Sequence, residues 1–431
     1  MNTSQNFSRR SLLKSGLGGI LASGVAPQFI PARLLGADAP SKKITLGCIG
    51  VGKHGFGVNL QSFLQLDDCR VTAICDTFKS RRARGIEAAD KKYAATGCAD
   101  IADFRELLAR QDIDAAVIST PDHWHIPMAT MAVEAGKHVF CEKPTLTIAE
   151  GRAFADLVVK KQAVFATGLE DRSLIKYHKL CQIVRGGGIG QVQRIVIKLP
   201  KKPVFPKEAT APVPAELNFD LWLGPAPRRD YFPSLTHDQV WRQIRDFSGG
   251  SLTDWGAHLI DTAQVAIRME NSSPVKVEGR GEIPPDSVNT VPHTYHLTYT
   301  YENGVVMEVS ADKPSIRVEG SDGWAGVEGW DGRLQASDMD IYRRQTGSPA
   351  DMLWPLPKRE HPNFLEVIRG GKMPNYSAEA LHRLSTTMHL GLIAMELGKP
   401  LRWDPQTESF DNDQANALRS RVSREDWKRV G

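Results

Sequence analysis

ITLGCIGVGKHG, residues 44–55, is the stretch that decides the fold. Its first half is an apolar run that predicts a buried strand, and its second half follows the pattern GxGxxG. In a nucleotide-binding turn, Gly50 permits the tight bend, Gly52 lets the backbone approach a pyrophosphate, and Gly55 allows close helix–strand packing. A helix-like segment at 58–66 follows. The stretch therefore predicts a strand–turn–helix unit that binds a dinucleotide.

An acidic residue ends the second predicted strand. Residues 70–75 are apolar and strand-like, and Asp76 follows them. A carboxylate there accepts hydrogen bonds from the ribose hydroxyls, which favours NAD over NADP. The spacing from the glycine turn is somewhat wider than the usual value of about 20 residues. Basic side chains at Lys79, Arg81 and Arg82 are suited to a 2′-phosphate, so NADP stays open as the alternative cofactor.

Strands and helices continue to alternate as far as residue 168. Further buried strands are predicted at 115–119, 138–141 and 163–168, with helices near 101–108, 126–135 and 148–161. This alternation predicts a parallel, doubly wound sheet. Ligands bind beyond the carboxyl ends of such strands. The residues at those ends that are candidates for ligand contacts are Thr120, Pro121, His123, Trp124, His125, Glu142 and Lys143.

The second half of the chain is richer in strands. Alternating patterns at 192–199, 275–279, 293–301, 305–310 and 317–320 predict an open, mostly antiparallel sheet with one face on helices. The Pro/Lys segment 200–215 is typical of an irregular loop. We expect an α/β fold, with a Rossmann domain at 42–170 and an α+β substrate and oligomerisation domain at 171–431. The free sheet face predicts a homo-oligomer, either a dimer or a tetramer.

The first forty residues have the pattern of a targeting segment. SRRSLLK at 8–14 resembles the twin-arginine export signal, with Leu12 where Phe is commonest. A Gly/Ala-rich run at 15–30 follows, too short and too small-residued for a stable membrane span. Residues 37–39 are Ala-Asp-Ala, which suits signal peptidase. We therefore expect a signal peptide at 1–39, the twin-arginine export machinery as a partner, and an exported, periplasmic protein.

Composition narrows the class of protein. Of the 431 residues, 41% are hydrophobic and 24% are charged, which is ordinary for a soluble globular protein. The net charge of +4 comes largely from the N-terminal segment, so no nucleic-acid partner is expected. None of the six cysteines forms a CxxC pair, which argues against a zinc knuckle. No motif spacing demands a metal.

Three motifs in this order resemble the Gfo/Idh/MocA oxidoreductase family. They are GVGKHG at 50–55, EKP at 142–144, and Asp254-xxx-His258 within GGSLTDWGAHLID. The likeness runs from about residue 44 to the C-terminus, and the segment 410–427 looks like the exported bacterial branch. The resemblance implies that Lys143, Asp254 and His258 surround the substrate carbon beside the nicotinamide, and that Pro144 is cis. The predicted cofactor contacts are Gly50, Gly52, Lys53, His54, Gly55, Asp76, Thr120, Pro121, His125, Glu142 and Lys143.

These residue types suit the oxidation of an alcohol. Histidine, with a pKa of roughly 6.5, is a suitable base for the hydroxyl proton. A lysine ammonium stabilises a developing alkoxide. Asp254 and His258 are four positions apart and share a helix face, so Asp254 either binds the substrate or orients the imidazole. Further substrate contacts are predicted at His123, Trp124, Arg172, Tyr177, Trp241 and Arg242.

Two activities follow from the resemblance. The first is NAD(P)-dependent oxidation of a CH–OH group in a sugar, inositol or related polyol. In the second, which resembles that of some exported relatives, transient oxidation breaks a glycosidic bond and NAD is recycled in the site. A sugar-binding protein without activity is a third reading, and the presence of Lys143, Asp254 and His258 argues against it. Leu169-Glu170-Asp171-Arg172 replaces the family's frequent Thr-Gln-Gln-Arg, which leaves the sugar open.

Overall fold

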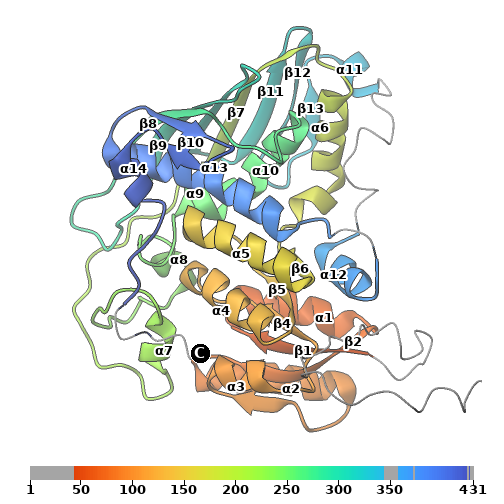
Figure 1. Ribbon diagram of the computed structural model, residues 1–431, viewed down its shortest axis with the longest axis vertical. Helices are drawn as coiled ribbons and strands as arrows, with labels where there is room; N and C mark the ends of the chain where they lie inside the picture. Colours follow the sequence, from red (N-terminus) through yellow and green to blue (C-terminus); the bar gives the residue numbers. More distant parts are fainter. Residues whose placement is uncertain (1–42, 344–357, 372–373, 425–426, 428–431) are drawn as a thin grey trace, which may run out of the picture. The chain divides into compact units, whose positions relative to one another are not determined.

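A computed structural model describes residues 43–343, 358–371, 374–424 and 427. From Lys43 onward the described residues belong to one compact unit (Figure 1). The signal peptide predicted at 1–39 lies outside the described residues. No helix within the described ranges is both long enough and apolar enough to cross a membrane.

The first sheet has the predicted parallel, doubly wound architecture. Its six strands run in the order β3-β2-β1-β4-β5-β6, and every neighbouring pair is parallel. The strands are β1 (Ile44–Ile49), β2 (Cys69–Cys75), β3 (Ala99–Ile101), β4 (Ala115–Ile118), β5 (His138–Cys141) and β6 (Phe165–Thr167). The strand order reverses between β1 and β4. A doubly wound sheet binds its ligand in the crevice at such a reversal.

Most helices around this sheet are close to those predicted, with corrections at their starts, but the helix at residues 79–93 was not predicted. The helices are η2 (Gly55–Leu60, a π-helix), α1 (Gln61–Gln65), α2 (Lys79–Tyr93), α3 (Phe104–Ala109), α4 (Asp122–Glu134) and α5 (Ile148–Lys161). The helix predicted from residue 101 begins at Phe104, because Ile101 pairs with Cys75 in the sheet. The helix predicted from 126 begins at Asp122, directly after Pro121.

The second sheet is open and mostly antiparallel, as predicted. Its nine strands run in the order β13-β12-β11-β7-β10-β9-β8-β14-β15, and β7–β10 is the one parallel pair among these described strands. They are β7 (Val192–Pro200), β8 (Lys276–Glu282), β9 (Thr294–Thr300), β10 (Val306–Asp312), β11 (Ser315–Gly320), β12 (Gly323–Glu328), β13 (Leu334–Ala336), β14 (Leu401–Asp404) and β15 (Ser409–Phe410). Burial alternates along β9 and β10, so one face of the sheet packs on helices.

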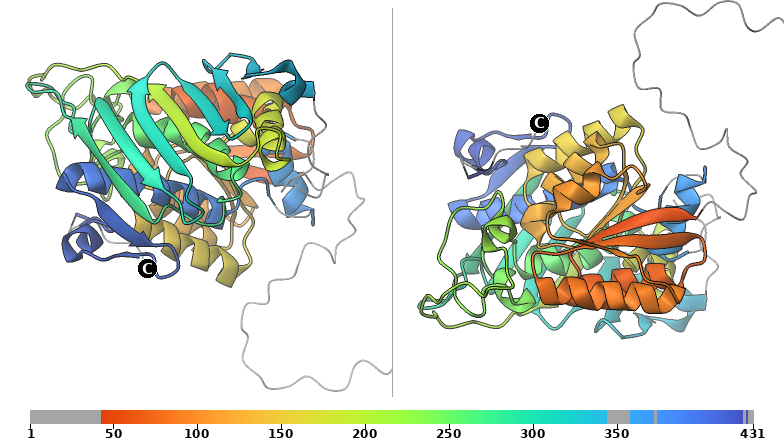
Figure 2. Two further views of the ribbon diagram at one scale, coloured as in Figure 1. Left: turned by 90° about the horizontal axis from the view of Figure 1, so that it is seen from above. Right: turned by 90° about the horizontal axis from the view of Figure 1, so that it is seen from below.

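The helices of the second half of the chain are η3 (Asp171–Ser173), α6 (Ile175–Arg185), α7 (Phe219–Leu223), α8 (Asp238–Trp241), α9 (Ser251–Asp254), α10 (Gly256–Ala266), α11 (Met339–Arg343), α12 (Glu360–Ile368), α13 (Ala378–Leu397) and α14 (Asp413–Ala417). Of these, α10 and α13 pack on one face of the second sheet (Figure 2). Helix α13 contacts α5 on one side and β8 on the other, as Figure 1 shows.

The hydrophobic cores cross the boundary that the sequence predicted at residue 170. Phe364 of α12 is buried in the core that contains β1. Leu381, in the first turn of α13, is buried with residues of β4 and β5. Farther along the same helix, Leu384 and Met388 are buried against the second sheet. The predicted boundary therefore separates the two sheets but not the two cores.

Candidate active site

A cavity of about 810 Å³ lies at the carboxyl ends of the parallel strands. Its lining includes Gly50 after β1, Thr120 after β4 and Lys143 after β5, and Asp254 and His258 from the second domain. The cavity therefore lies where the strand order reverses, at the position expected for a ligand of this fold.

The glycine turn fits a pyrophosphate. Gly50 has a φ of +82°, and a Cβ there would lie 2.8 Å from the carbonyl carbon of Ser119. A Cβ on Gly55 would lie 2.1 Å from the carbonyl oxygen of Gly50. Gly52 lines the cavity. The turn thus excludes a side chain at Gly50 and Gly55, which is what close packing of the strand, turn and helix start around a phosphate requires.

Asp76 connects this turn to the end of β2. The backbone N–H of Val51 donates to its Oδ2 at 2.8 Å, and that of Phe78 donates to its Oδ1 at 2.9 Å. Burial raises the pKa of Asp76 above its usual range, although the nearby Arg81 opposes the shift. Asp76 also lines the cavity, and a carboxylate has lone pairs left for a ribose hydroxyl.

The basic residues that suggested NADP have separate contacts. Arg82 donates to the carbonyl oxygen of Asp76 at 2.9 Å and also pairs with Asp100. The guanidinium of Arg81 stacks 4.0 Å above the ring of Phe78 and lines the cavity. Lys79 is absent from the cavity lining within the described residues. Arg81 is therefore the one basic residue of this group beside the ribose position.

Substituting Gly50 with alanine tests the turn. The added Cβ meets backbone at a positive φ, so the turn must shift. We expect the free energy of unfolding to fall by about 2–4 kcal/mol and the affinity for NAD to fall more than about tenfold. Gly57→Ala is the control, because a Cβ there meets nothing within 4 Å although Gly57 also lines the cavity. Calorimetric titration with NAD and thermal unfolding measure both effects; equal NAD affinities in the two variants would contradict the assignment.

Substituting Asp76 with serine tests the choice of cofactor. Loss of a charged hydrogen-bond acceptor is expected to weaken NAD binding by about 10- to 100-fold. NADP binding should change less, because its 2′-phosphate is repelled by the carboxylate. Fluorescence titration with NADH and NADPH measures the ratio. Lys79→Ala, outside the cavity lining, should leave that ratio unchanged.

Lys143 and Asp254 form a charged cluster across the two domains. The ammonium of Lys143 donates to Oδ1 and to the backbone oxygen of Asp254, both at 2.9 Å. Lys202 donates to Oδ2 at 3.0 Å, and Nε of Arg242 lies 3.6 Å from Oδ1. Burial opposes the charge, but Lys143, Arg242 and Lys202 outweigh it and hold the pKa of Asp254 well below its usual range. The peptide bond between Lys143 and Pro144 is cis, as predicted.

The imidazole of His258 is held by carboxylates of another segment. Its Nδ1 lies 3.3 Å from Oδ1 of Asp171 and 3.8 Å from Oε2 of Glu170. Burial lowers its affinity for a proton, but Glu170 and Asp171 outweigh burial and raise the pKa of His258 above 6.5. Among the described residues, Nδ1 contacts Asp171 and not Asp254, whose carboxylate is paired with Lys143 and Lys202. Asp171 therefore orients the ring and leaves Nε2 for a substrate.

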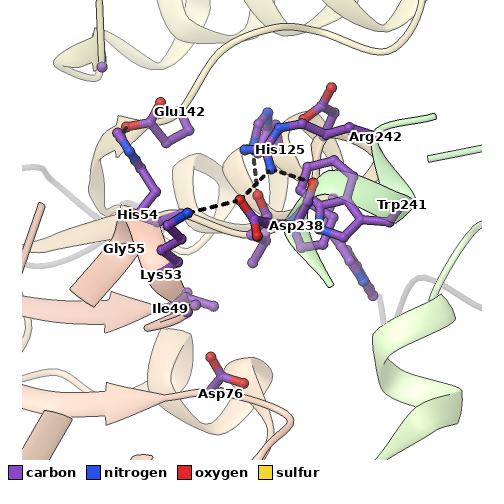
Figure 3. A pocket seen from close by; sticks show the side chains of 18 of the residues that line it. Ile49, Lys53, His54, Gly55, Asp76, His125, Glu142, Asp238, Trp241 and Arg242 are labelled. Atoms are coloured by element: carbon purple, nitrogen blue, oxygen red, sulfur yellow. Dashed lines mark hydrogen bonds and ion pairs between the residues drawn. The ribbon is translucent and has the colours of Figure 1, made fainter. Parts of the chain in front are cut away.

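The remaining predicted cofactor contacts connect the strand ends. Glu142 accepts a hydrogen bond from Asn59 at 2.8 Å, and His54 lies 3.1 Å from the same oxygen. The ring nitrogens of His125 each lie 2.9 Å from a carbonyl oxygen, one of Thr120 and one of Pro144. Figure 3 shows His54 beside Glu142 in the pocket.

A charged rim joins the two domains outside this centre. Figure 3 shows Lys53 and Arg242 pointing toward Asp238. Lys53 lies 3.9 Å and Arg242 3.7 Å from Oδ2 of Asp238. Lys53 is strongly exposed, so its pair with Asp238 contributes little to stability.

Half of the predicted substrate contacts lie outside the cavity. Trp124, Trp241 and Arg242 line it. His123 is fully buried, and its Nε2 lies 3.0 Å from the carbonyl oxygen of Trp222. Arg172 pairs through two nitrogens with Asp261, and Tyr177 is buried in the core of the second domain. The structure therefore places His123, Arg172 and Tyr177 in buried contacts outside the cavity lining.

Several residues of the site were not predicted from the sequence. Lys202 lies just after β7 in a loop without periodicity. The ring of Trp330 lies 5.1 Å from that of His258 and 5.4 Å from that of Trp255. Asp171 follows the carboxyl end of β6, a position that the rule used for the other strands would have selected. Within the described ranges, no group of His, Cys, Asp and Glu side chains is arranged to hold a metal ion.

Comparison with known proteins identifies both halves of the chain. The family model described as oxidoreductase family, NAD-binding Rossmann fold, matches residues 44–169. The model described as oxidoreductase family, C-terminal alpha/beta domain, matches residues 205–429. The two matches meet at the cavity, which takes its lining from both.

Individual relatives cover the chain to different extents. Glycosyl hydrolase family 109 protein 1 of Shewanella sp. (strain ANA-3) is 32% identical over 190 residues, which are 43% of this chain and 38% of that protein. The alpha-N-acetylgalactosaminidase of Shewanella oneidensis matches with the same identity and coverage. The chain thus spans well under half the length of the curated relatives it matches.

Solved structures share the fold at low identity. The aldose-aldose oxidoreductase of Caulobacter crescentus, crystallised with glycerol, has a TM-score of 0.62 at 19% identity, over 84% of this chain and 100% of that one. The WlbA dehydrogenase of Bordetella pertussis, in complex with NADH and UDP-GlcNAcA, has a TM-score of 0.63 at 15% identity, over 84% and 99%.

Proposed function

Because the chain belongs to the Gfo/Idh/MocA oxidoreductase family, we propose that it oxidises a CH–OH group of a sugar, inositol or related polyol with NAD. One observation carries the proposal: His258, with Nδ1 directed at Asp171, lines the same cavity as Lys143 and the glycine turn. When bound, NAD supplies the acceptor for the hydride that leaves the alcohol carbon. Gly50, Gly52 and Asp76 are the residues that would hold it.

Residues of the protein carry out the remaining parts of the reaction. His258 accepts the hydroxyl proton at Nε2. Lys143 remains an ammonium, because Asp254 and Glu142 outweigh burial and raise its pKa, and it stabilises the negative charge that develops on the substrate oxygen. Asp254 remains ionised among its cations, so it positions Lys143 rather than acting as the base.

The cavity walls support a sugar or polyol as the substrate. Trp241, Trp255 and Trp330 line the cavity on the side of the second domain. Their rings offer apolar faces for the C–H face of a sugar, while Lys143, Lys202 and Arg242 donate hydrogen bonds to hydroxyl oxygens. Convergent polar groups on an aromatic wall are typical of a site that orients a small polar ligand.

A panel assay tests the proposal. The purified protein is incubated with NAD and a series of sugars, inositols and other polyols, and the near-ultraviolet absorbance of NADH is followed. Accumulation of NADH with at least one substrate supports the dehydrogenase. Absence of NADH throughout, together with unchanged sugar binding by Lys143→Ala, would favour a binding protein instead.

Glycoside cleavage is the second candidate activity. It is favoured by the relatives named glycosyl hydrolase family 109 protein 1 and alpha-N-acetylgalactosaminidase, each 32% identical over the matched segment. It would begin with the same oxidation and use Lys143, Asp254 and His258. The hydride would then return from the cofactor to the sugar within the site. Release of nitrophenol from aryl glycosides without accumulation of NADH distinguishes it from net dehydrogenation.

We also propose that the protein is exported and forms a homo-oligomer. Arg9 and Arg10 in the twin-arginine pattern support export to the periplasm by the folded-protein route. Cell fractionation of the wild type and of a variant with both arginines changed to lysine tests this. Light scattering on the purified protein tests for a dimer or tetramer, and a monomer would contradict it.

A further inference from the structure

A single tyrosine hydroxyl lies between two buried carboxyl groups behind His258. The hydroxyl of Tyr376 lies 2.7 Å from Oδ2 of Asp171 and 2.7 Å from Oδ2 of Asp261. Arg172 donates to both oxygens of Asp261, at 2.8 and 2.6 Å. At the other end, Oδ1 of Asp171 faces Nδ1 of His258. The five side chains form one continuous chain of contacts.

The geometry of these five side chains constrains the number of protons that they share. A phenol hydroxyl donates one hydrogen bond, so Tyr376 satisfies only one of two ionised carboxylates. The second short oxygen–oxygen contact would then join lone pairs without a proton. One additional proton, on a carboxyl group, removes the conflict. Asp261 already has both oxygens paired with a guanidinium, whereas Asp171 has no such cation among its described contacts apart from the imidazole.

We propose that Asp171 carries this proton in the resting enzyme and acts as a positioning residue for His258. Its protonated Oδ2 donates to Tyr376, and Tyr376 donates to Asp261. Its Oδ1 accepts from Nδ1–H of His258. Every buried polar atom in the chain is then paired, as is usual for groups removed from water.

The surroundings of Asp171 favour its neutral form. Burial raises the pKa of Asp171 to about 7; Asp261 adds to the shift, and His258 and Tyr376 oppose it. The titratable and charged groups that face Asp171 and its partners are His258, Asp261, Tyr376, Arg172, Glu170, Tyr177, Cys181 and Lys143. Of these, Arg172 is held by Asp261 and Lys143 by Asp254.

The direction of these hydrogen bonds determines the tautomer of His258. A neutral His258 that donates from Nδ1 has its lone pair on Nε2, the nitrogen left for the substrate. In the proposed reaction, on which this inference rests, the substrate O–H bond breaks and an Nε2–H bond forms. The alcohol carbon becomes a carbonyl as its hydride passes to NAD. The proton then leaves from Nε2 to solvent through the cavity.

Substituting Asp171 with asparagine is the decisive test, because a carboxamide mimics a protonated carboxyl group. Its carbonyl oxygen accepts from Nδ1–H, and its amino group donates to Tyr376. Nitrogen NMR of ¹⁵N-histidine-labelled protein reports the tautomer, with the His258 signals identified by their loss in His258→Gln. We expect the neutral form of His258 to be the Nδ1–H tautomer in the wild type and in Asp171→Asn, with kcat within about fivefold of wild type. Asp171→Ala should lose the single tautomer and about 10²- to 10³-fold in kcat, with little change in KM.

Two results would overturn the proposal. If Asp171 worked as an ionised carboxylate, Asp171→Asn would switch the tautomer and lose about 10⁴-fold in kcat. If Asp171→Ala kept both the tautomer and the rate, Asp171 would not position His258. Should Asp171→Ala fail to fold, the wild-type and Asp171→Asn spectra still decide. The spectra need no substrate, so a panel that yields no NADH would reject the proposed function without affecting the tautomer result.

Discussion

Replacing Lys143 with methionine is expected to lower kcat by about 10²- to 10³-fold, because the alkoxide loses its cationic hydrogen-bond donor. Methionine keeps most of the aliphatic stem, so packing in the cavity is largely retained. Asp254 would keep Lys202 and Arg242 as partners, which should preserve the fold around it. The rate of NADH formation on the substrate found by the panel, with NAD binding measured separately, tests this expectation.

Lys202 provides the matched comparison. It donates to the other oxygen of the same carboxylate and also lines the cavity. If the ammonium of Lys143 acts on the reacting oxygen, Lys202→Met should cost about tenfold or less. Equal losses in the two variants would indicate that both lysines act only by neutralising Asp254. A fully active Lys143→Met would remove Lys143 from the mechanism.

Replacing His258 with glutamine is expected to lower kcat by about 10²- to 10⁴-fold and to abolish the acidic limb of its pH profile. The base works in its neutral form, so the rate falls as pH drops through its pKa. Because the Glu170 carboxylate beside it is the leading charge that raises that pKa above 6.5, the loss should begin at a higher pH than for a solvent-exposed histidine. Steady-state rates across the pH range measure the midpoint.

Glu170→Gln separates charge from hydrogen bonding in the same profile. Glu170 is the leading charge that raises the pKa of His258, and its Oε2 lies 3.8 Å from Nδ1, beyond a hydrogen bond. Its neutralisation should move the acidic midpoint to lower pH without a comparable loss of maximal rate. An acidic limb that persists in His258→Gln would show that another group is the base.

Local patterns predicted the parts of the site that lie on the first sheet. The turn at Gly50, the carboxylate of Asp76 and the position of Lys143 each follow from a strand and the few residues after it. Strand β3 was missed because its three residues are too few to show a period. Strands β12 to β15 were missed too: β13, β14 and β15 have only two to four residues, and β12 contains two glycines.

Contacts between distant segments were beyond such patterns. The Asp171–His258 contact joins positions 87 apart, and the Lys202–Asp254 contact joins positions 52 apart. The spacing of Asp254 and His258 predicted one face of one helix. In the structure Asp254 ends α9 and His258 lies in α10, and the two side chains have different partners. Arg172 was misjudged because its burial depends on Asp261 and Tyr376, both remote in sequence.

Helix α13 has a consequence for how the molecule unfolds. Leu381 completes the core beneath the nucleotide-binding sheet, and Met388 on the same helix belongs to the core of the other sheet. Unfolding of either half therefore removes core contacts from the other half. The two halves should unfold cooperatively, in one calorimetric transition. A fragment ending near residue 170 would lack α12 and α13 and expose the apolar surface that they cover. A fragment that ends where the first sheet ends is therefore not expected to fold on its own.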